Sequence, residues 1–230
     1  MQGPFGLFDI LILIIIRGLP TTLALTFLSL AIGFLIGTVL ALMRVFGHFI
    51  VRYIAIGYEK IFRGIPLLVL IFIFGAALLG WFAWTGSLAN AIFVASMLSL
   101  ALRSAAYQSE IFRGAILSVD PGQIMAARSI GMTTTQATRS IILPQAFRLS
   151  LPGWANEYAV VIKDTSLASA IGVSDLIYQA QAFTWDYPAL FLAIILVVAI
   201  IYFVFTYPVT KYLGESMTLK LRQLGLGGGR

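Results

Sequence analysis

The chain has 230 residues, a formal net charge of +6 and no cysteine. It is 60% hydrophobic and only 10% charged, with a mean hydropathy of +0.98, far above that of a soluble domain. The lack of cysteine excludes disulfides, thiolate metal sites and cysteine catalysis. The positive charge does not indicate nucleic-acid binding, because the basic residues cluster in segments that alternate with long apolar runs.

Three long runs carry no charged residue: 18–43, 64–102 and 187–210. A membrane-spanning helix needs about 20 apolar residues, so the first and third runs each fit one span. The middle run is long enough for most of two spans, and the glycines and aromatic residues at 80–90 predict a short exposed turn between them. The apolar tract 5–16 contains Asp9 and lacks a basic start, which predicts an interfacial lead-in to the first span rather than a signal peptide.

We therefore predict an all-α membrane protein that forms one transmembrane domain over residues 1–230. The spans are helices, because a lone strand cannot satisfy its backbone groups in lipid. A transmembrane β-barrel would show alternating ten-residue segments, and none is visible. The predicted spans lie at about 18–43, 64–82, 88–111, 150–171 and 187–210.

The basic residues predict the orientation of these spans. Positively charged loops stay in the cytoplasm. Basic residues follow the first, third and last spans, at Arg44, Arg52, Lys60, Arg63, Arg113, Arg128, Arg139, Arg148, Lys211, Lys220, Arg222 and Arg230. The intervening connections hold no basic residue. The N-terminus is therefore expected outside and the C-terminus in the cytoplasm.

The fourth predicted span carries three charges, at Glu157, Lys163 and Asp164, together with Asn156. Each charge at a bilayer centre costs about 2.5–3.5 kcal/mol on the insertion scale. This segment must therefore face other helices, water or a ligand. Glu157 and Asp164 are seven residues apart and share one helix face. Pro152–Gly153 is expected to break the helix near its start and to free backbone groups that line a cavity.

The third predicted span adds polar groups near its end. Arg103, Tyr107 and Glu110 follow an i, i+4, i+7 pattern on one face, and Ser104 lies beside them. Ionisable residues within a membrane are functional candidates by default. The alternative is mutual pairing that holds the helices together, Glu110 with Arg103 or Arg113 and Lys163 with Asp164 or Glu157. The candidate substrate path consists of Arg103, Ser104, Tyr107, Glu110, Asn156, Glu157, Lys163 and Asp164.

The loop 114–146 between these two spans has its own helix signals. Asp120–Pro121 combines an N-cap acceptor with a proline at the first helical position. Gly131 is expected to end this helix in a left-handed conformation. Thr133 or Thr134 can cap a second helix, and Pro144 is expected to mark a boundary before the fourth span. A helix lying flat on the membrane surface is the alternative.

The spacing of Ala126–Ala127, Gly131 and Ile141–Pro144 resembles the EAA loop in the permease subunits of bacterial ABC importers. Further stretches resemble the polar amino-acid branch of these permeases, the histidine, arginine and glutamine type, over about residues 15–215. These stretches are Gly18–Leu23, Phe62–Leu68, Ala106–Gly114, Lys163–Leu167 and Ile171–Val173. Two positions depart from the family pattern: Met125 replaces the loop glutamate, and Lys60 replaces an acidic residue that Glu59 provides one position earlier.

The resemblance implies the transmembrane domain of an ABC type I importer in a bacterial inner membrane. Its implied partners, besides the lipid bilayer, are a second identical or paralogous permease chain, two ATP-binding cassette subunits and an extracytoplasmic amino-acid-binding protein. The chain has no Gly-x4-Gly-Lys-Ser/Thr motif, so we expect no enzyme activity and no cofactor in it, with ATP and Mg²⁺ held by the partner ATPase. The ATPase is expected to contact Gln123, Met125, Ala126, Ala127, Arg128, Gly131 and Met132.

The charges within the spans favour a basic amino acid such as arginine, lysine or histidine as the substrate. The three acids Glu110, Glu157 and Asp164 outnumber the two bases Arg103 and Lys163, and an ion that leaves water needs an opposite charge. Glutamine and glutamate stay open as substrates.

A proton-coupled carrier that uses Glu157 and Lys163 is the main alternative, although many carriers show two related halves and none is visible. The sequence shows no selectivity filter typical of a channel. It also shows no metal-ligand set and no nucleophile–base pair, so no catalytic or metal-binding residue is predicted. A purely structural subunit would not need three charges on one face.

Overall fold

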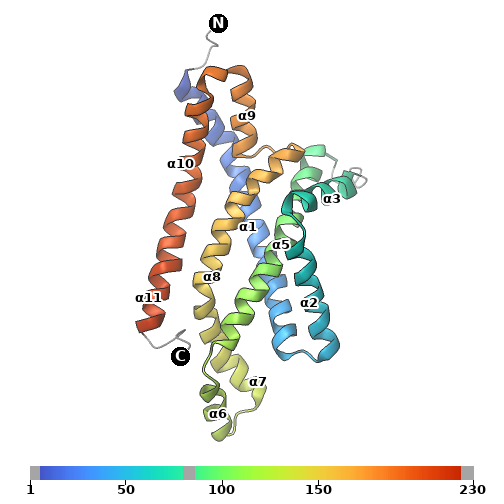
Figure 1. Cartoon of the computed structure of the whole chain (residues 1–230), viewed down its shortest axis with the longest axis vertical. Coiled ribbons are helices and arrows are strands. Elements are labelled where there is room, and N and C mark those ends of the chain that lie inside the picture. Colours follow the sequence, from blue (N-terminus) through green and yellow to red (C-terminus); the bar gives the residue numbers. More distant parts are fainter. Residues whose placement is uncertain (1–5, 80–85, 224–230) are drawn as a thin grey trace.

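The computed structural model describes residues 6–79 and 86–223, and the regular elements in these two stretches are all helices (Figure 1). In chain order they are α1 (Leu7–Phe46), α2 (Phe49–Gly64), α3 (Leu67–Leu79), α5 (Leu88–Leu117), α6 (Pro121–Ser129), α7 (Thr134–Ala137), η1 (Thr138–Ile142), α8 (Leu143–Asp164), η2 (Thr165–Ile171), α9 (Leu176–Asp186), η3 (Pro188–Leu190), α10 (Phe191–Val209), η4 (Thr210–Glu215) and α11 (Ser216–Gln223).

Three helical stretches of the described chain are long and apolar enough to cross a membrane: Leu7–Phe46, Leu88–Leu117 and Pro188–Leu221. A fourth crossing exists if α2 and α3 count as one span. α8 has sufficient length but is too polar to join this set. The predicted all-helical membrane architecture is confirmed, while the number of five spans stays a prediction.

The first long helix begins earlier than predicted. α1 runs without interruption from Leu7 to Phe46, so the tract predicted as an interfacial lead-in belongs to the same helix as the first span. Asp9 stabilises the start, because its Oδ2 accepts a 3.1 Å hydrogen bond from the Gly6 N–H. Pro20 lies inside the helix and does not end it.

The second predicted span, 64–82, is divided differently in the structure. Residues 49–64, predicted as a basic loop, form the helix α2, and the axes of α2 and α3 differ by 101°. The bend falls at Ile65, whose backbone is extended (φ −93°, ψ 130°). Pro66 explains this conformation, because the residue before a proline is disfavoured in a helix. Residues 80–82 of the predicted span lie outside the described stretches.

α1 and α5 form the most extensive helix pair. Gly33 and Gly37 let the two backbones approach closely: a Cβ atom on Gly37 would lie 2.9 Å from the Ala105 carbonyl oxygen. Two long-range hydrogen bonds hold the same contact. Ser29 Oγ donates to the Met97 carbonyl over 3.1 Å, and Gln108 Nε2 donates to the Leu30 carbonyl over 3.3 Å. Small residues with interhelical hydrogen bonds are typical of helix packing in membranes.

The fourth predicted span begins earlier and has no break at its proline. α8 continues through Pro152 and Gly153, so the predicted break there is wrong. Gly153 serves helix packing instead, because a Cβ atom at that position would lie 2.8 Å from Ile111 Cγ2 on α5. After Asp164 the chain tightens into the 3₁₀ helix η2, which ends at Gly172 in the left-handed region (φ +90°).

The helix signals at Asp120–Pro121, Gly131 and Thr133 are confirmed, whereas the boundary predicted at Pro144 is wrong. Asp120 caps α6, with its Oδ1 accepting a 2.6 Å hydrogen bond from the Gly122 N–H. Gly131 follows the helix in the left-handed region (φ +87°). Thr133 then caps α7 in a capping box with Gln136. The π-turn η1 joins α7 to α8, and Pro144 lies in the first turn of α8 rather than between two helices.

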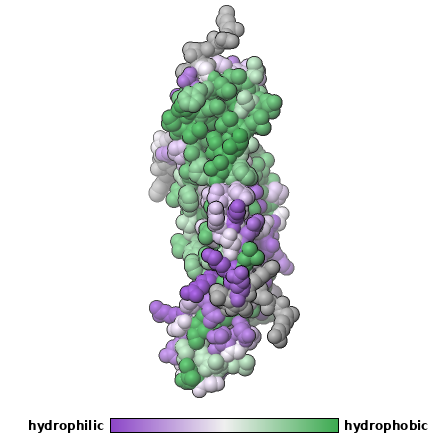
Figure 2. Space-filling view, turned by 90° about the vertical axis from the view of Figure 1, so that its left-hand side faces the viewer, coloured by the Kyte–Doolittle hydropathy of each residue, from purple (hydrophilic) through white to green (hydrophobic). Residues whose placement is uncertain are grey.

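The two ends of the elongated molecule differ in composition. α9 and the start of α10 pack beside the first part of α1, at the end where the N-terminus lies, and α6 and α7 form the opposite end (Figure 1). Seen from the α10 side, the surface is mostly hydrophobic near the N-terminal end and more hydrophilic toward the other (Figure 2).

Asp175 caps α9 by accepting a 2.8 Å hydrogen bond from the Tyr178 N–H, and it is fully buried.

Candidate functional site

A charged contact joins the middle of the bundle. Arg103 on α5 donates a 2.5 Å hydrogen bond to Asp164 at the end of α8, and the two side chains are 20% and 25% exposed. Glu157 lies two turns earlier on α8 and is only 4% exposed. Its polar neighbours are Ser104, Arg103 and Asp164. Glu157 Oε1 has no hydrogen-bond partner among the described residues, and a buried carboxylate oxygen without a partner is costly.

The structure therefore brings together a subset of the predicted path residues. Arg103, Ser104, Glu157 and Asp164 meet between α5 and α8. The Asp164 side chain pairs with Arg103 rather than with Lys163, so the predicted alternative of a Lys163–Asp164 pair is wrong. Within the described stretches Lys163 takes part in no ion pair with a carboxylate.

Two predicted residues, Asn156 and Lys163, lie on another side of α8, where both are exposed. Asn156 lines a cavity of about 530 Å³ between α8 and the η4–α11 segment. Lys163 lines a cavity of about 520 Å³ between α8 and α10. Residues that adjoin one another in sequence thus serve two different surfaces of the same helix, because successive residues are rotated by about 100°.

Tyr107 extends the charged region toward α2. The guanidinium carbon of Arg103 lies 5.0 Å from the centre of the Tyr107 ring. The guanidinium carbon of Arg63, on α2, lies 5.0 Å from the same centre. Both distances are typical of cation–π contacts. Tyr107 also lines a polar cavity of about 530 Å³, whose other lining residues are Arg44, Ile56, Glu59, Lys60, Arg63, Gly64 and Glu110.

Glu110 belongs to an ion-pair network at the base of this cavity. It pairs with Arg113, as one of the sequence alternatives predicted, and with Arg44 at the end of α1. Arg44 also pairs with Glu59 on α2, and Ser109 Oγ donates to the same Glu59 carboxylate. The other predicted partner of Glu110, Arg103, pairs with Asp164 instead.

Arg44, Glu59 and Arg63 were not predicted as site residues, because the sequence pattern placed them in a cytoplasmic loop. A usable signal was present. Ile56, Glu59, Lys60 and Arg63 recur with the spacing of one helix face. The structure places these four side chains along the same cavity.

Most of the loop residues predicted to contact an ATPase are exposed on and next to α6. Met125 is 66% exposed and Ile130 is 78% exposed, and Gln123, Ala126, Arg128 and Gly131 are also exposed. Met132 is half-buried. Ala127 differs, because its side chain is 2% exposed and packs inside the loop. Ala126 is therefore accessible on the surface of α6, while Ala127 is not.

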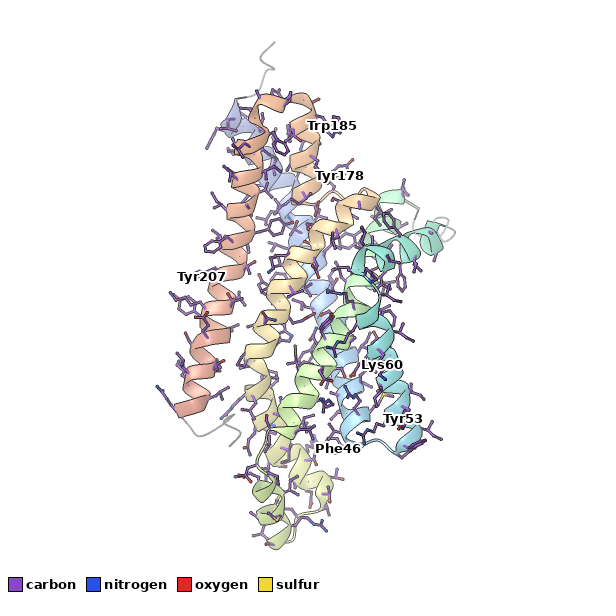
Figure 3. All side chains as sticks on the ribbon, in the orientation of Figure 1. Phe46, Tyr53, Lys60, Tyr178, Trp185 and Tyr207 are labelled. Atoms are coloured by element: carbon purple, nitrogen blue, oxygen red, sulfur yellow. The ribbon has the colours of Figure 1, made fainter. Side chains whose placement is uncertain are left out.

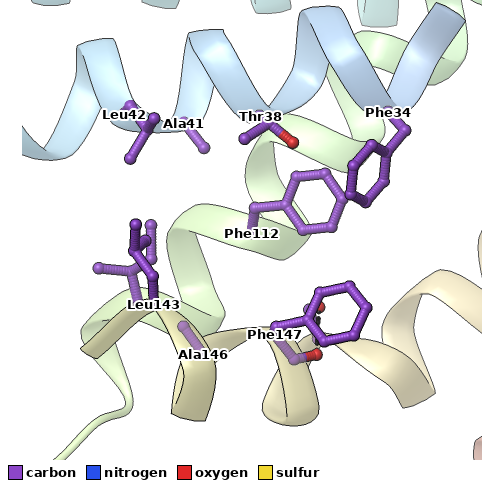
Figure 4. Close-up of a pocket in the computed structure, with 10 residues that line it drawn as sticks. Phe34, Thr38, Ala41, Leu42, Phe112, Leu143, Ala146 and Phe147 are labelled. Carbon is purple, nitrogen blue, oxygen red and sulfur yellow. Dashed lines mark hydrogen bonds between the residues drawn. The ribbon is translucent and has the colours of Figure 1, made fainter. Parts of the chain in front are cut away.

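A further cavity of about 220 Å³ lies between α1, α5 and α8 (Figure 4). Its lining is almost entirely apolar, and the Ser150 hydroxyl there donates to the Phe147 carbonyl over 2.8 Å. This lining does not suit a polar solute. The described residues also contain no group of three histidine or carboxylate side chains able to hold a metal ion.

Comparison with known proteins agrees with this arrangement. The family model described as "Binding-protein-dependent transport system inner membrane component" matches residues 29–210. The nopaline transport system permease protein NocM of Agrobacterium fabrum (strain C58 / ATCC 33970) is 44% identical over 168 residues, which cover 70% of this chain and 69% of NocM. The L-cystine transport system permease protein TcyL of Bacillus subtilis (strain 168) is 41% identical over 165 residues, which cover 71% of this chain and 69% of TcyL.

Solved structures show the same fold. A crystal structure of an amino acid ABC transporter with histidines matches with a TM-score of 0.76 and 36% identity, covering 92% of this chain and 94% of that one. The MetNI methionine ABC transporter in an inward-facing conformation matches with a TM-score of 0.70 at 20% identity, covering 93% of this chain and 98% of that one. This match supports the fold alone. In such systems ATPase activity is provided by a separate subunit. Its match to the family model, with these relatives, shows that the chain belongs to the binding-protein-dependent transport system inner membrane components, as the multi-pass permease subunit of an amino-acid ABC transporter.

Proposed function

We propose that this chain forms the translocation path for a positively charged amino acid, arginine, lysine or histidine. The observation that carries the proposal is the buried contact of Arg103, Asp164 and Glu157 between α5 and α8. Asp164 neutralises Arg103, and Glu157 is left with a buried oxygen that has no partner among the described residues. A carboxylate in this state favours a cationic group, because an ion removed from water needs an opposite charge.

The named relatives leave the choice of substrate open. Their names specify nopaline, octopine and L-cystine, so membership of the family does not select one amino acid. The charge balance between α5 and α8 is the feature that favours a basic substrate over glutamine or glutamate. Acidic side chains would meet repulsion from Glu157.

The exposed surface of α6 supports a second part of the proposal, which concerns the partner subunits. We propose that an ATP-binding cassette subunit docks on the loop 114–146, where Met125 and Ile130 expose apolar side chains. Two copies of this chain, or this chain and a paralogue, would enclose the path between two such ATPases. An extracytoplasmic binding protein would deliver the amino acid, and five spans with the N-terminus outside would place α6 in the cytoplasm of a bacterium.

The experiment is ATP-driven uptake in proteoliposomes. The chain is co-reconstituted with its ATPase and binding protein, and uptake of labelled L-arginine is measured with glutamine and glutamate as competitors. Glu157→Gln is compared with wild type, and Asp186→Asn serves as the control because Asp186 is an exposed carboxylate at the end of α9. We expect Glu157→Gln to slow arginine uptake at least tenfold and Asp186→Asn to leave it unchanged.

Three results would contradict parts of the proposal. Uptake that Glu157→Gln leaves unchanged would show that the carboxylate has a structural role. Strong competition by glutamate would overturn the basic substrate. Uptake driven by a proton gradient without any ATPase would exclude the importer mechanism altogether.

A further inference from the structure

The guanidinium groups of Arg103 and Arg63 have similar positions but different partners. Both lie over the Tyr107 ring at 5.0 Å. A guanidinium that stacks on a ring uses its flat face, and its N–H donors still point outward in its plane. Arg103 uses one of these donors to bind the Asp164 carboxylate at 2.5 Å. Arg63 has no carboxylate within ion-pair distance among the described residues.

The cavity beside Arg63 is positively charged. Its lining and the network at its base contain four cationic side chains, Arg44, Lys60, Arg63 and Arg113, against the two carboxylates of Glu59 and Glu110. Both carboxylates are already held: Arg44 pairs with each of them, and Arg113 pairs with Glu110. Lys60, like Arg63, pairs with no carboxylate in the described stretches.

The two unpaired cations share one side of α2. Residues 56, 59, 60, 63 and 64 fall on one helix face, and all five line the cavity. Lys60 is labelled on α2 in Figure 3. Across the cavity, α5 contributes Tyr107 and Glu110, and α1 contributes Arg44. The volume of about 530 Å³ lies within the range of small-molecule sites. This cavity therefore suits a small solute that carries an anionic group.

We propose that Arg63, assisted by Lys60, binds the α-carboxylate of the transported amino acid in the cavity between α2 and α5. The contact of Arg103 with Asp164 provides the template: a guanidinium supported by Tyr107 presents its N–H groups to a carboxylate. Arginine can bind both carboxylate oxygens at once, and lysine adds a point charge. The inference rests on the proposed function, since it assumes that an amino acid passes this cavity, and it adds a substrate-binding role for α2.

The test measures binding to the permease–ATPase complex in nanodiscs without the binding protein, so that selection by that protein does not contribute. The probes are labelled L-arginine, agmatine (which is arginine without its carboxylate) and inorganic phosphate as a competitor, with L-glutamine in a parallel series. The variants are Arg63→Gln, Arg63→Lys and Lys60→Gln. Arg52→Gln is the matched control, because Arg52 is an exposed arginine on α2 that does not line the cavity.

We expect Arg63→Gln to weaken L-arginine binding at least tenfold and not to weaken agmatine binding, because agmatine has no carboxylate and carries only positive charges. Arg63→Lys should recover part of the loss, Lys60→Gln should weaken binding severalfold, and Arg52→Gln should match wild type. Equal losses for arginine and agmatine, or no loss, would overturn the carboxylate assignment, as would phosphate competing as well as arginine. If the wild-type complex takes up arginine with ATP but shows no arginine binding in this assay, the proposed carboxylate site is overturned and the proposed function is not. Absence of ATP-driven uptake would instead contradict the proposed function.

Discussion

The Arg103 guanidinium binds the Asp164 carboxylate at 2.5 Å and so connects the middle of α5 to the end of α8. This ion pair lies directly before the tightening of the chain from α8 into η2. Glu157 lies two turns before Asp164 on α8, next to the same arginine. The same pair makes Arg103 electrically neutral as seen from Glu157, so the local charge balance depends on it.

Removing one partner of this pair should cost stability. Asp164→Asn leaves a partly buried guanidinium without its counter-charge, and we expect a loss of about 1–3 kcal/mol in the free energy of unfolding. Arg103→Gln should cost a similar amount. The double variant Arg103→Gln/Asp164→Asn should be more stable than the sum of the two losses predicts, and thermal unfolding in detergent measures this. Strict additivity would show that the two side chains do not interact.

Gly37 should not tolerate a larger side chain. A Cβ atom there would lie 2.9 Å from the Ala105 carbonyl oxygen, which is backbone and cannot turn aside. We expect Gly37→Ala to separate α1 from α5 and to cost about 1–3 kcal/mol. Gly57→Ala on α2 is the control, because no atom lies within 4 Å of its added Cβ. If both variants unfold at the same temperature, the close approach of α1 and α5 does not matter for stability.

Stability should depend on pH through Asp175, which lies in the connection between η2 and α9. Burial raises the pKa of Asp175 to about 7, above its ordinary value of 3.8. The folded state then binds the proton more tightly than the unfolded state, so stability falls as pH rises from about 4 to about 7 and levels off above that. The whole change in the free energy of unfolding is on the order of 4 kcal/mol.

Asp175→Asn should remove this dependence. Asparagine keeps the side-chain oxygen that caps α9 at the Tyr178 N–H and has no charge to bury. Unfolding temperatures between pH 5 and pH 8 should therefore fall for wild type and stay nearly constant for the variant. A parallel decline in both proteins would assign the pH dependence to another group.

The exposed apolar side chains of the loop should determine ATPase binding. We expect Met125→Ala/Ile130→Ala to weaken binding of the ATPase at least tenfold without changing the unfolding temperature, because both side chains are exposed in the permease itself. Trp185→Ala is the control. Trp185 is 86% exposed on α9, far from the loop at the other end of the molecule (Figure 3). Binding is measured by co-purification and by surface plasmon resonance.

The glutamate that is usual in this loop provides a second test. Met125→Glu should leave the loop folded, because the side chain at this position is 66% exposed. It should raise the salt dependence of ATPase binding if the partner offers a basic residue there. Loss of the folded loop would instead show that Met125 has a role within the permease.

Much of the chain could be predicted because its signals are local. The apolar runs gave the long helices, and Asp120–Pro121, Gly131 and Thr133 gave the loop helices with their caps. The α2–α3 bend was harder to predict from the sequence. The apolar run that starts at Gly64 resembles a straight span, and only Pro66 signals a change of direction.

The site was predictable by residue type but not by pairing. The sequence showed that the charges of α5 and α8 must avoid lipid, yet it left the partner of each open. Pairing depends on helix rotation and on contacts between distant segments. Arg103 and Asp164 are 61 positions apart, and Arg44 and Glu110 are 66 apart. Gly33 and Gly37 offered an unused signal, since two small residues four apart often mark a close helix contact.

The uninterrupted run from α7 through η1 into α8 connects the loop to the charged contact by one continuous helix. Thr134 to Asp164 is helical throughout, without a hinge at Pro144 or at Pro152. A rod of this length spans about 45 Å, and the surface proposed for the ATPase lies at one end of it and the Asp164–Arg103 contact at the other. A displacement of α7 would reach the Asp164–Arg103 contact through this one helical run. The π-turn of η1 is the segment of the run whose hydrogen bonding differs from the α-helical pattern, so its stiffness would set how much of such a displacement reaches the charged contact.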